Sequence, residues 1–325
     1  MDFRPGIIPL RPLTMNDIFG GVFRAVRGNV AATVGLAALT SLVFLVPFTA
    51  LGAWVSSQES SVSLEESVAD DTAGLMGSLG TVIPSIGSSL STILLAGFLA
   101  YVIGQAVLGR KVSAGETWRA TIRRIWALLG ATLLTVLVFA VTVGATLGVP
   151  IGLLVAGGSA GNDGTIAAGI VLLLLAILLL LVVMFFFWTR LAFVTPSLIL
   201  EDLSVGRAFS RSWQLTGGRP FWRLLGIRLL AAVAISVVGS LITVPLALLG
   251  AGLAFTGMPM DQMYVWQAVI TGVTGVVAGA ITTPVTAGID SLLYVDERMR
   301  REGLDVHLAQ TAQGTAAAPW PRADA

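Results

Sequence analysis

Six long apolar stretches constrain this chain more than any other feature of its sequence. Each holds about 20 or more residues, enough for a helix to cross the hydrocarbon core of a bilayer. They cover residues 29–55, 81–108, 128–156, 166–194, 225–255 and 264–294. Hydrophobic residues make up 55% of the chain and charged residues 11%, which is more apolar surface than one water-soluble domain can bury. The sequence therefore predicts an all-α integral membrane protein with six transmembrane helices.

The charged residues divide the connections between these spans into two sets. Every Lys and Arg lies in the N-terminal segment, in the connections after the second and fourth spans, at the span ends, or in the tail. The other three connections carry acidic residues and no basic one, and the longest, residues 58–80, is expected to be a solvated loop. By the positive-inside rule both termini are cytoplasmic. We therefore expect a multi-pass protein of the bacterial plasma (inner) membrane.

Two segments flank the membrane domain, which covers residues 29–309. In residues 1–28, Thr14 and Asp17 have the spacing of a capping box, so this cytoplasmic segment is expected to carry an amphipathic helix. Residues 310–325 are rich in Ala, Thr and Pro. That composition predicts a disordered cytoplasmic tail.

A unit of one short cytoplasmic helix and two spans occurs three times along the chain. The units begin at Thr14, Ser113 and Ser204, and each has an aromatic residue five positions later. The first span of each unit reaches a Val-Pro dipeptide near its outer end. We interpret the pattern as three repeats of an interfacial helix plus a helical hairpin, all in one orientation. The shared composition of membrane helices is the alternative explanation.

The third cytoplasmic segment has the strongest signal for contact with a membrane surface, because it combines arginine with large aromatic residues. A short helix opened by Ser204 would lie flat, with its aromatic side chains toward the acyl chains and its arginines toward phosphate headgroups. The side chains predicted to contact anionic headgroups are Arg207, Arg211, Trp213, Arg219, Trp222 and Arg223.

Ionisable residues within the spans are few, and Arg190 and Asp290 are the strong candidates. Aromatic neighbours place both near the inner headgroup level. Two interpretations stay open at this point. Either each side chain reaches headgroups and water on its own, or the two form a buried polar pair that joins the fourth and sixth spans.

Residues suited to catalysis are scarce. The chain contains no HExxH or P-loop motif, no cysteine, and a single histidine. A carboxylate pair for acid/base catalysis would have to come from residues at the cytoplasmic span ends, where solvated side chains are expected. These residues are Glu201, Asp202, Asp296 and Glu297. We predict no catalytic residue, no metal, no cofactor and no nucleic-acid partner.

Several motifs resemble one bacterial family. They are Arg11-Pro12-Leu13 with Asp17-Ile18, Ala208-Phe209 with Arg211-Ser212-Trp213, Phe221-Trp222-Arg223, and the closing LYVDERMRREGLD of residues 293–305. The family is similar to the membrane domain of glycerophosphoryl diester phosphodiesterases, and the resemblance covers nearly the whole chain. The catalytic barrel, with its metal-binding carboxylates and histidines, has no counterpart here. The resemblance therefore implies membrane residence and not diesterase activity.

Taken together, these features predict a non-enzymatic, lipid-contacting membrane module with a role in envelope or membrane homeostasis. Membrane lipids are the expected partners, and other proteins are further candidates. The alternative is a small permease for a lipid-like or small-molecule substrate. A permease should expose a polar path at mid-membrane, and these spans supply few groups for one.

Overall fold

The computed structural model describes residues 6–59, 72–253, 257, 260–317 and 319–320. In these residues all regular secondary structure is helical. Six segments are long and apolar enough to cross a membrane: Thr33–Val55, Ile86–Val107, Ile125–Ala160, Asp163–Leu200, Pro220–Gly252 and Val269–Glu302. The prediction of an all-helical chain with six candidate spans is confirmed at that level.

Short helices alternate with long ones along the chain. The elements are α1 (Met15–Gly28), the π-helical turn η1 (Ala31–Gly35), α2 (Leu36–Glu59), α4 (Thr72–Val107), α5 (Ala114–Ile122), α6 (Ile125–Ala160), α7 (Asp163–Arg190), α8 (Val194–Leu200), α9 (Val205–Leu215), α10 (Pro220–Gly252), α11 (Met260–Glu302) and α12 (Leu304–Ala312).

Local capping explains where the short helices begin. Thr14 caps α1 by accepting from the backbone N–H of Asp17, and the Asp17 carboxylate accepts from the N–H of Thr14, so the predicted capping box is confirmed. Ser204 occupies the N-cap position of α9, as predicted. Its hydroxyl accepts a hydrogen bond from Arg207 Nε at 3.1 Å instead of capping the helix backbone.

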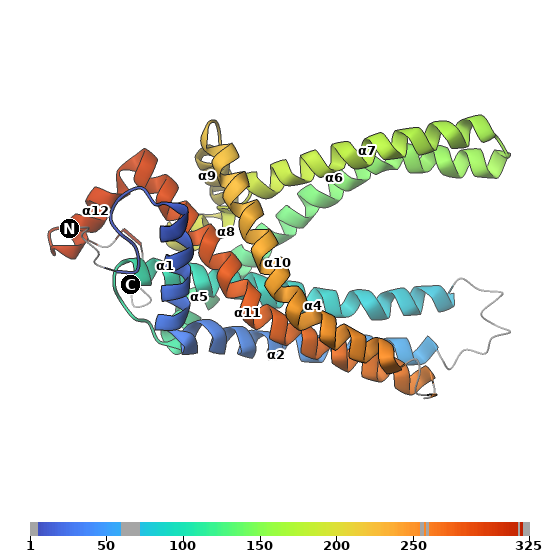
Figure 1. Ribbon diagram of the computed structural model, residues 1–325, viewed down its shortest axis with the longest axis horizontal. Coiled ribbons are helices and arrows are strands. Elements are labelled where there is room, and N and C mark those ends of the chain that lie inside the picture. Colours follow the sequence, from blue (N-terminus) through green and yellow to red (C-terminus); the bar gives the residue numbers. More distant parts are fainter. Residues whose placement is uncertain (1–5, 60–71, 254–256, 258–259, 318, 321–325) are drawn as a thin grey trace.

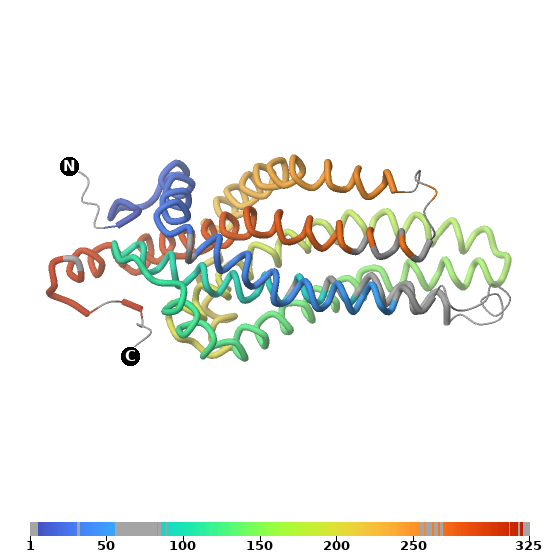
Figure 2. Tube along the Cα trace, turned by 90° about the horizontal axis from the view of Figure 1, so that it is seen from below, coloured from blue at the N-terminus to red at the C-terminus, as the bar shows by residue number. Residues whose placement is uncertain are grey.

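The short helices gather at one end of the molecule, and the long ones extend from there. Figure 1 shows α1, α5, α8, α9 and α12 at that end, while α2, α4, α10 and α11 run together as a bundle. The α6–α7 hairpin leans away from this bundle toward its tip, and Figure 2 shows the same long axis from a second side. Large apolar side chains on the hairpin are exposed, with Leu133 at 72% and Leu178 at 64%. Such a surface suits acyl chains better than water.

The largest buried cluster lies where the short helices meet the bundle. It joins side chains of α1, α4, α10 and α11, and Tyr294 packs edge to face on Phe193 with ring centroids 5.5 Å apart. Trp320 belongs to this cluster at 3% exposure, and its indole N–H donates to the Gly104 carbonyl at 3.0 Å. The prediction of a disordered tail is therefore wrong for the described residues up to Trp320. An aromatic side chain that finds both a core position and an acceptor holds this segment in place.

One predicted boundary also needs correction. Residues 72–80 belong to the predicted solvated loop, but they form the first turns of α4. All five acidic residues of the predicted loop precede residue 72, so this end of it is uncharged and continues the helix. Residues 60–71, the rest of that acidic stretch, lie outside the described residues. The fourth candidate span, Asp163–Leu200, covers the predicted residues 166–194 and includes a break in the helix, because α7 ends at Arg190. At this break Ser212 on α9 donates to the Arg190 carbonyl and accepts from the Phe193 N–H.

Candidate functional site

The end of α11 carries the densest group of charges in the described chain. The helix continues well past its apolar part because three pairs spaced four residues apart support it. The pairs are Asp296 with Arg300, Glu297 with Arg301, and Arg298 with Glu302. Gly303 then adopts a left-handed conformation with φ of 64° and ends the helix.

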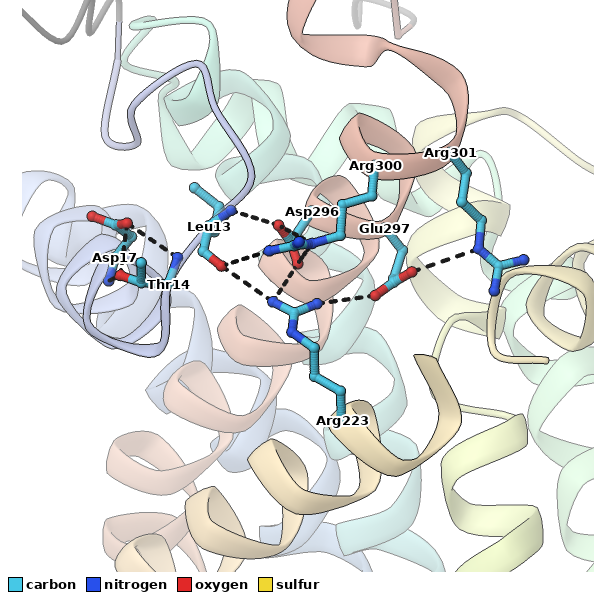
Figure 3. Close-up of polar contacts among 8 residues, drawn as sticks. All are labelled: Leu13, Thr14, Asp17, Arg223, Asp296, Glu297, Arg300 and Arg301. Carbon is cyan, nitrogen blue, oxygen red and sulfur yellow. Dashed lines mark hydrogen bonds and ion pairs between the residues drawn. The ribbon is translucent and has the colours of Figure 1, made fainter. Parts of the chain in front are cut away.

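Asp296 lies at the centre of what we call the α11 ion network, formed by Asp296, Glu297, Arg223, Arg300 and the backbone of Leu13 (Figure 3). Its carboxylate accepts from the Leu13 N–H at 2.6 Å and contacts Arg223 at 2.7 Å and Arg300 at 3.0 Å. Arg223 also contacts Glu297 at 3.0 Å. Both arginines donate to the Leu13 carbonyl, at 3.1 and 3.0 Å.

This geometry corrects the expectation that the carboxylates at the end of α11 are solvated. Asp296 is 0% exposed and Glu297 is 1% exposed. They are buried because the start of α10 and the segment before α1 cover this part of α11. A carboxylate excluded from water is tolerated only when cations and hydrogen bonds compensate, and the arginines supply both.

A second group of charges surrounds Glu201, which follows α8. Arg211 donates to its carboxylate at 2.9 and 3.1 Å, the Tyr294 hydroxyl also donates to it, and Arg298 lies 3.3 Å away. Arg211 contacts Glu302 as well, at 2.6 Å. Burial raises the pKa of Glu201, but the hydrogen bonds from Arg211 and Tyr294 and the charge of Arg298 outweigh burial and hold this pKa below its ordinary value of 4.5.

The six residues predicted to contact lipid headgroups fall into two sets. Arg211 contacts the partly buried Glu201 and Arg223 contacts the buried Asp296, so both serve as internal ion-pair partners. The other four are exposed side chains of the α9–α10 region: Arg207, Trp213, Arg219 and Trp222. Trp222 is 73% exposed and Trp213 is 42% exposed. We call these four the α9–α10 belt, and their contact with headgroups stays a prediction.

The predicted pair of Arg190 and Asp290 is wrong. Asp290 instead binds Arg228 through two hydrogen bonds, of 2.8 and 2.9 Å. Arg190 turns toward α9, where it donates to the Trp213 carbonyl at 3.1 Å and lies 4.6 Å from the centroid of that indole ring. The physical reason is position: Arg190 is on the last turn of α7 beside α9, whereas Arg228 lies two turns into α10 beside α11.

Sequence reasoning missed Arg228 because it was grouped with the basic residues at the end of its span. A usable signal was present, since Arg228 is a lone charge with apolar residues on both sides, beyond the basic connection. Its guanidinium also lies 4.1 Å from the Trp188 ring centroid and donates to the Trp188 carbonyl. That carbonyl is near the end of α7, where backbone acceptors lack helical partners and a cation is favourable. Arg228 therefore joins α7, α10 and α11.

Two cavities flank the Arg228–Asp290 pair. One, of about 170 Å³, lies toward α6 and α8 and is lined by Thr135, Trp188 and Thr195 among others. The other, of about 400 Å³, runs between α10 and α11. Hydroxyls along this second cavity, such as those of Ser236 and Thr282, bond to carbonyls of their own helices and so present little free polarity.

Comparison with known proteins places the chain in a family without a known activity. A family described as a domain of unknown function (DUF7847) matches residues 13–292. The chain belongs to this family. No curated protein and no solved structure matches it. The matched region of the family includes Leu13, Arg223, Arg228 and Asp290 and ends before Asp296. The resemblance to the membrane domain of phosphodiesterases stays a prediction.

The chemistry available at this end is ionic and hydrogen-bonding. Among the described residues, no group of three or more His, Cys, Asp or Glu side chains could hold a metal ion. Asp296 and Glu297 are occupied by arginines, so their charges stabilise the arrangement of α10, α11 and the N-terminal segment. The groups available to an external ligand are the exposed basic and aromatic side chains around this network.

Proposed function

We propose that this protein is a non-enzymatic, lipid-contacting module of the bacterial inner membrane with a role in envelope or membrane homeostasis. Both termini lie in the cytoplasm in this proposal, and the cytoplasmic end contacts anionic headgroups. The chain is further proposed to consist of three repeats of an interfacial helix plus a hairpin, and to be related to the membrane domain of glycerophosphoryl diester phosphodiesterases. The order of short and long helices supports the repeat interpretation.

The observation that carries the lipid proposal is the α9–α10 belt. Arg207 and Arg219 are exposed, and neither contacts a carboxylate of the described residues. Two exposed tryptophans accompany them: Trp213 near the end of α9, and Trp222 at the start of the membrane-length helix α10. Amphipathic aromatic rings are favoured at the boundary between acyl chains and headgroups, and arginine adds attraction for anionic lipid.

Lipid retention by the full-length protein tests this proposal. We expect native mass spectrometry to show more retained phosphatidylglycerol than phosphatidylcholine. Arg207→Gln with Arg219→Gln should weaken this preference by about fivefold for each charge, from about 1 kcal/mol per basic residue near the surface. Ser210→Ala, an exposed neutral change on α9, is the matched control. Equal retention of both lipids by the parent protein would contradict the proposal.

Orientation is tested separately with a reporter that is active only outside the cytoplasm. Inserted after Asn162, between α6 and α7, the reporter should be active. Inserted after Gly115 or Gly206, it should be inactive. Activity at Gly115 would contradict the proposed orientation.

A small permease for a lipid-like substrate is the second candidate, and the cavities beside Arg228 and Asp290 favour it. A transported substrate should pass close to this pair, because it is the strongest polar feature inside the spans. Thr282→Phe would fill the 400 Å³ cavity without changing a charge. If the protein is a permease, this variant should block movement of a fluorescent lipid across proteoliposomes while the protein stays folded. Equal movement with and without protein would exclude this function for that lipid.

A further inference from the structure

A second basic site lies away from the α9–α10 belt, between α1 and the end of α4. It is a cavity of about 190 Å³ whose lining includes Gly6, Arg24, Gly28, Arg110 and Lys111. The volume is many times the ~10–15 Å³ that one water molecule requires, so it accommodates a phosphate group with bound water. We call it the basic pocket.

The cations of the basic pocket are not neutralised by the described part of the chain. Arg24, Arg110 and Lys111 are exposed, and none of them contacts a carboxylate of a described residue. Arg24 donates only to a carbonyl, that of Ile7, through Nε at 3.0 Å and Nη2 at 2.8 Å. Three basic residues therefore line one cavity, and no carboxylate of the described residues offsets their charge. A bound anion would stabilise this arrangement.

The walls of the basic pocket are held in place before any ligand binds. The Ile7 N–H donates to the Ala106 carbonyl at 3.2 Å, and the Asn29 side chain donates to the Val112 carbonyl at 2.6 Å. Gly6 passes so close to α4 that an added Cβ would lie 2.4 Å from the Ala106 carbonyl oxygen. The two hydrogen bonds to Ile7 also orient the Arg24 guanidinium. Such preorganisation lowers the entropic cost of binding.

The surroundings of the basic pocket indicate the source of the anion. On α1, Phe23 is next to Arg24 and is 63% exposed, and Val30 beyond the helix is 53% exposed. The candidate span Thr33–Val55 begins directly afterwards, and α4, the other wall, is itself a candidate span. A cationic cavity beside exposed apolar residues at the end of two spans suits an anion attached to acyl chains.

We infer that the basic pocket binds the phosphate of an anionic membrane lipid through Arg24, Arg110 and Lys111. This inference rests on the proposed lipid-contacting function and adds a defined site to it. The exposed belt would contact headgroups collectively, whereas the basic pocket would retain one lipid.

The test measures phosphatidylglycerol binding to the full-length protein by native mass spectrometry. Arg110→Gln combined with Lys111→Gln should lower the affinity for the tightest-bound lipid at least tenfold, because each charge contributes about fivefold. Lys111→Arg should retain binding. Gly28→Leu keeps all charges and adds bulk at a lining position where the space is open, so the variant should fold normally and bind the same lipid more weakly. Arg119→Gln, which removes an exposed charge on α5 outside both the pocket and the belt, is the matched control and should retain it.

The outcomes separate this site from the general proposal. If only the belt variant loses lipid, the basic pocket is not a lipid site and the proposed function stands. If the parent protein shows no preference for anionic lipid, both proposals are wrong. Glycerol 3-phosphate and inorganic phosphate form the soluble arm. If either soluble phosphate binds as tightly as phosphatidylglycerol, and the pocket variants lose that binding as well, the ligand is a free phosphate and not a lipid.

Discussion

Two groups of basic residues lie at the same end of this molecule and differ in what neutralises them. In the α11 ion network, Arg223 and Arg300 both contact Asp296, a carboxylate that is 0% exposed. In the basic pocket, Arg110 and Lys111 are exposed and contact no carboxylate of the described residues. The same residue types therefore stabilise the fold in one place and remain available to a ligand in the other.

Burial explains why the two groups behave differently. A buried carboxylate such as Asp296 must be compensated, so its arginines are committed and their removal is costly. An exposed cation retains its hydration and contributes little to stability. Removing it should affect binding more than folding. The following predictions probe this contrast.

Asp296→Ala should cause the largest loss of stability. It removes the carboxylate shared by Arg223 and Arg300 and leaves the Leu13 N–H without its acceptor. Breaking a buried ion pair in this way costs about 3–5 kcal/mol. We expect that loss in the free energy of unfolding in detergent. Asp305→Ala, which removes a half-exposed carboxylate in the first turn of α12, should cost less than about 1 kcal/mol. Equal losses would contradict the structural role of the network.

The Arg228–Asp290 pair extends the contrast to the spans. Asp290→Leu should cost about 3 kcal/mol because it leaves Arg228, which is 7% exposed, without its carboxylate. Adding Arg228→Leu should recover part of that loss, as measured by thermal unfolding. Combining Asp290→Leu with Arg190→Leu should give additive losses, because Arg190 bonds elsewhere. Additive losses for Arg228 and Asp290 would show that they do not interact.

Glu201 allows a test by pH. Its pKa is lower in the folded protein than its ordinary value of 4.5, so its stabilisation is fully present above that value. The stabilisation is lost as the pH falls through the folded-state pKa, because protonation weakens the contacts with Arg211 and Arg298. The melting temperature should therefore decrease as the pH falls below 4.5, and Glu201→Gln should make this decrease shallower. An unchanged slope in Glu201→Gln would assign the acid sensitivity to other carboxylates.

The smallest effect on stability is expected in the basic pocket. Lys111→Gln should change the free energy of unfolding by less than about 0.5 kcal/mol, because the side chain is exposed and has no carboxylate partner among the described residues. Measured beside Asp296→Ala, this variant gives the contrast directly. A loss of several kcal/mol would show that Lys111 belongs to the structural framework instead.

The sequence by itself determined the helical class, the number of candidate spans and the capping box at Thr14 and Asp17. These features depend on hydrophobicity along one segment and on groups three residues apart, and both can be read from consecutive residues.

Only the tertiary structure decided which charges meet. Three hydrogen-bonded pairs illustrate this. Arg228 and Asp290 are 62 positions apart in the sequence, Trp320 and Gly104 are 216 apart, and Leu13 and Asp296 are 283 apart. No local pattern specifies such partners, because they depend on how helices pack and rotate against each other. For the same reason, Asp296 and Glu297 are buried although their sequence is that of a solvated helix end.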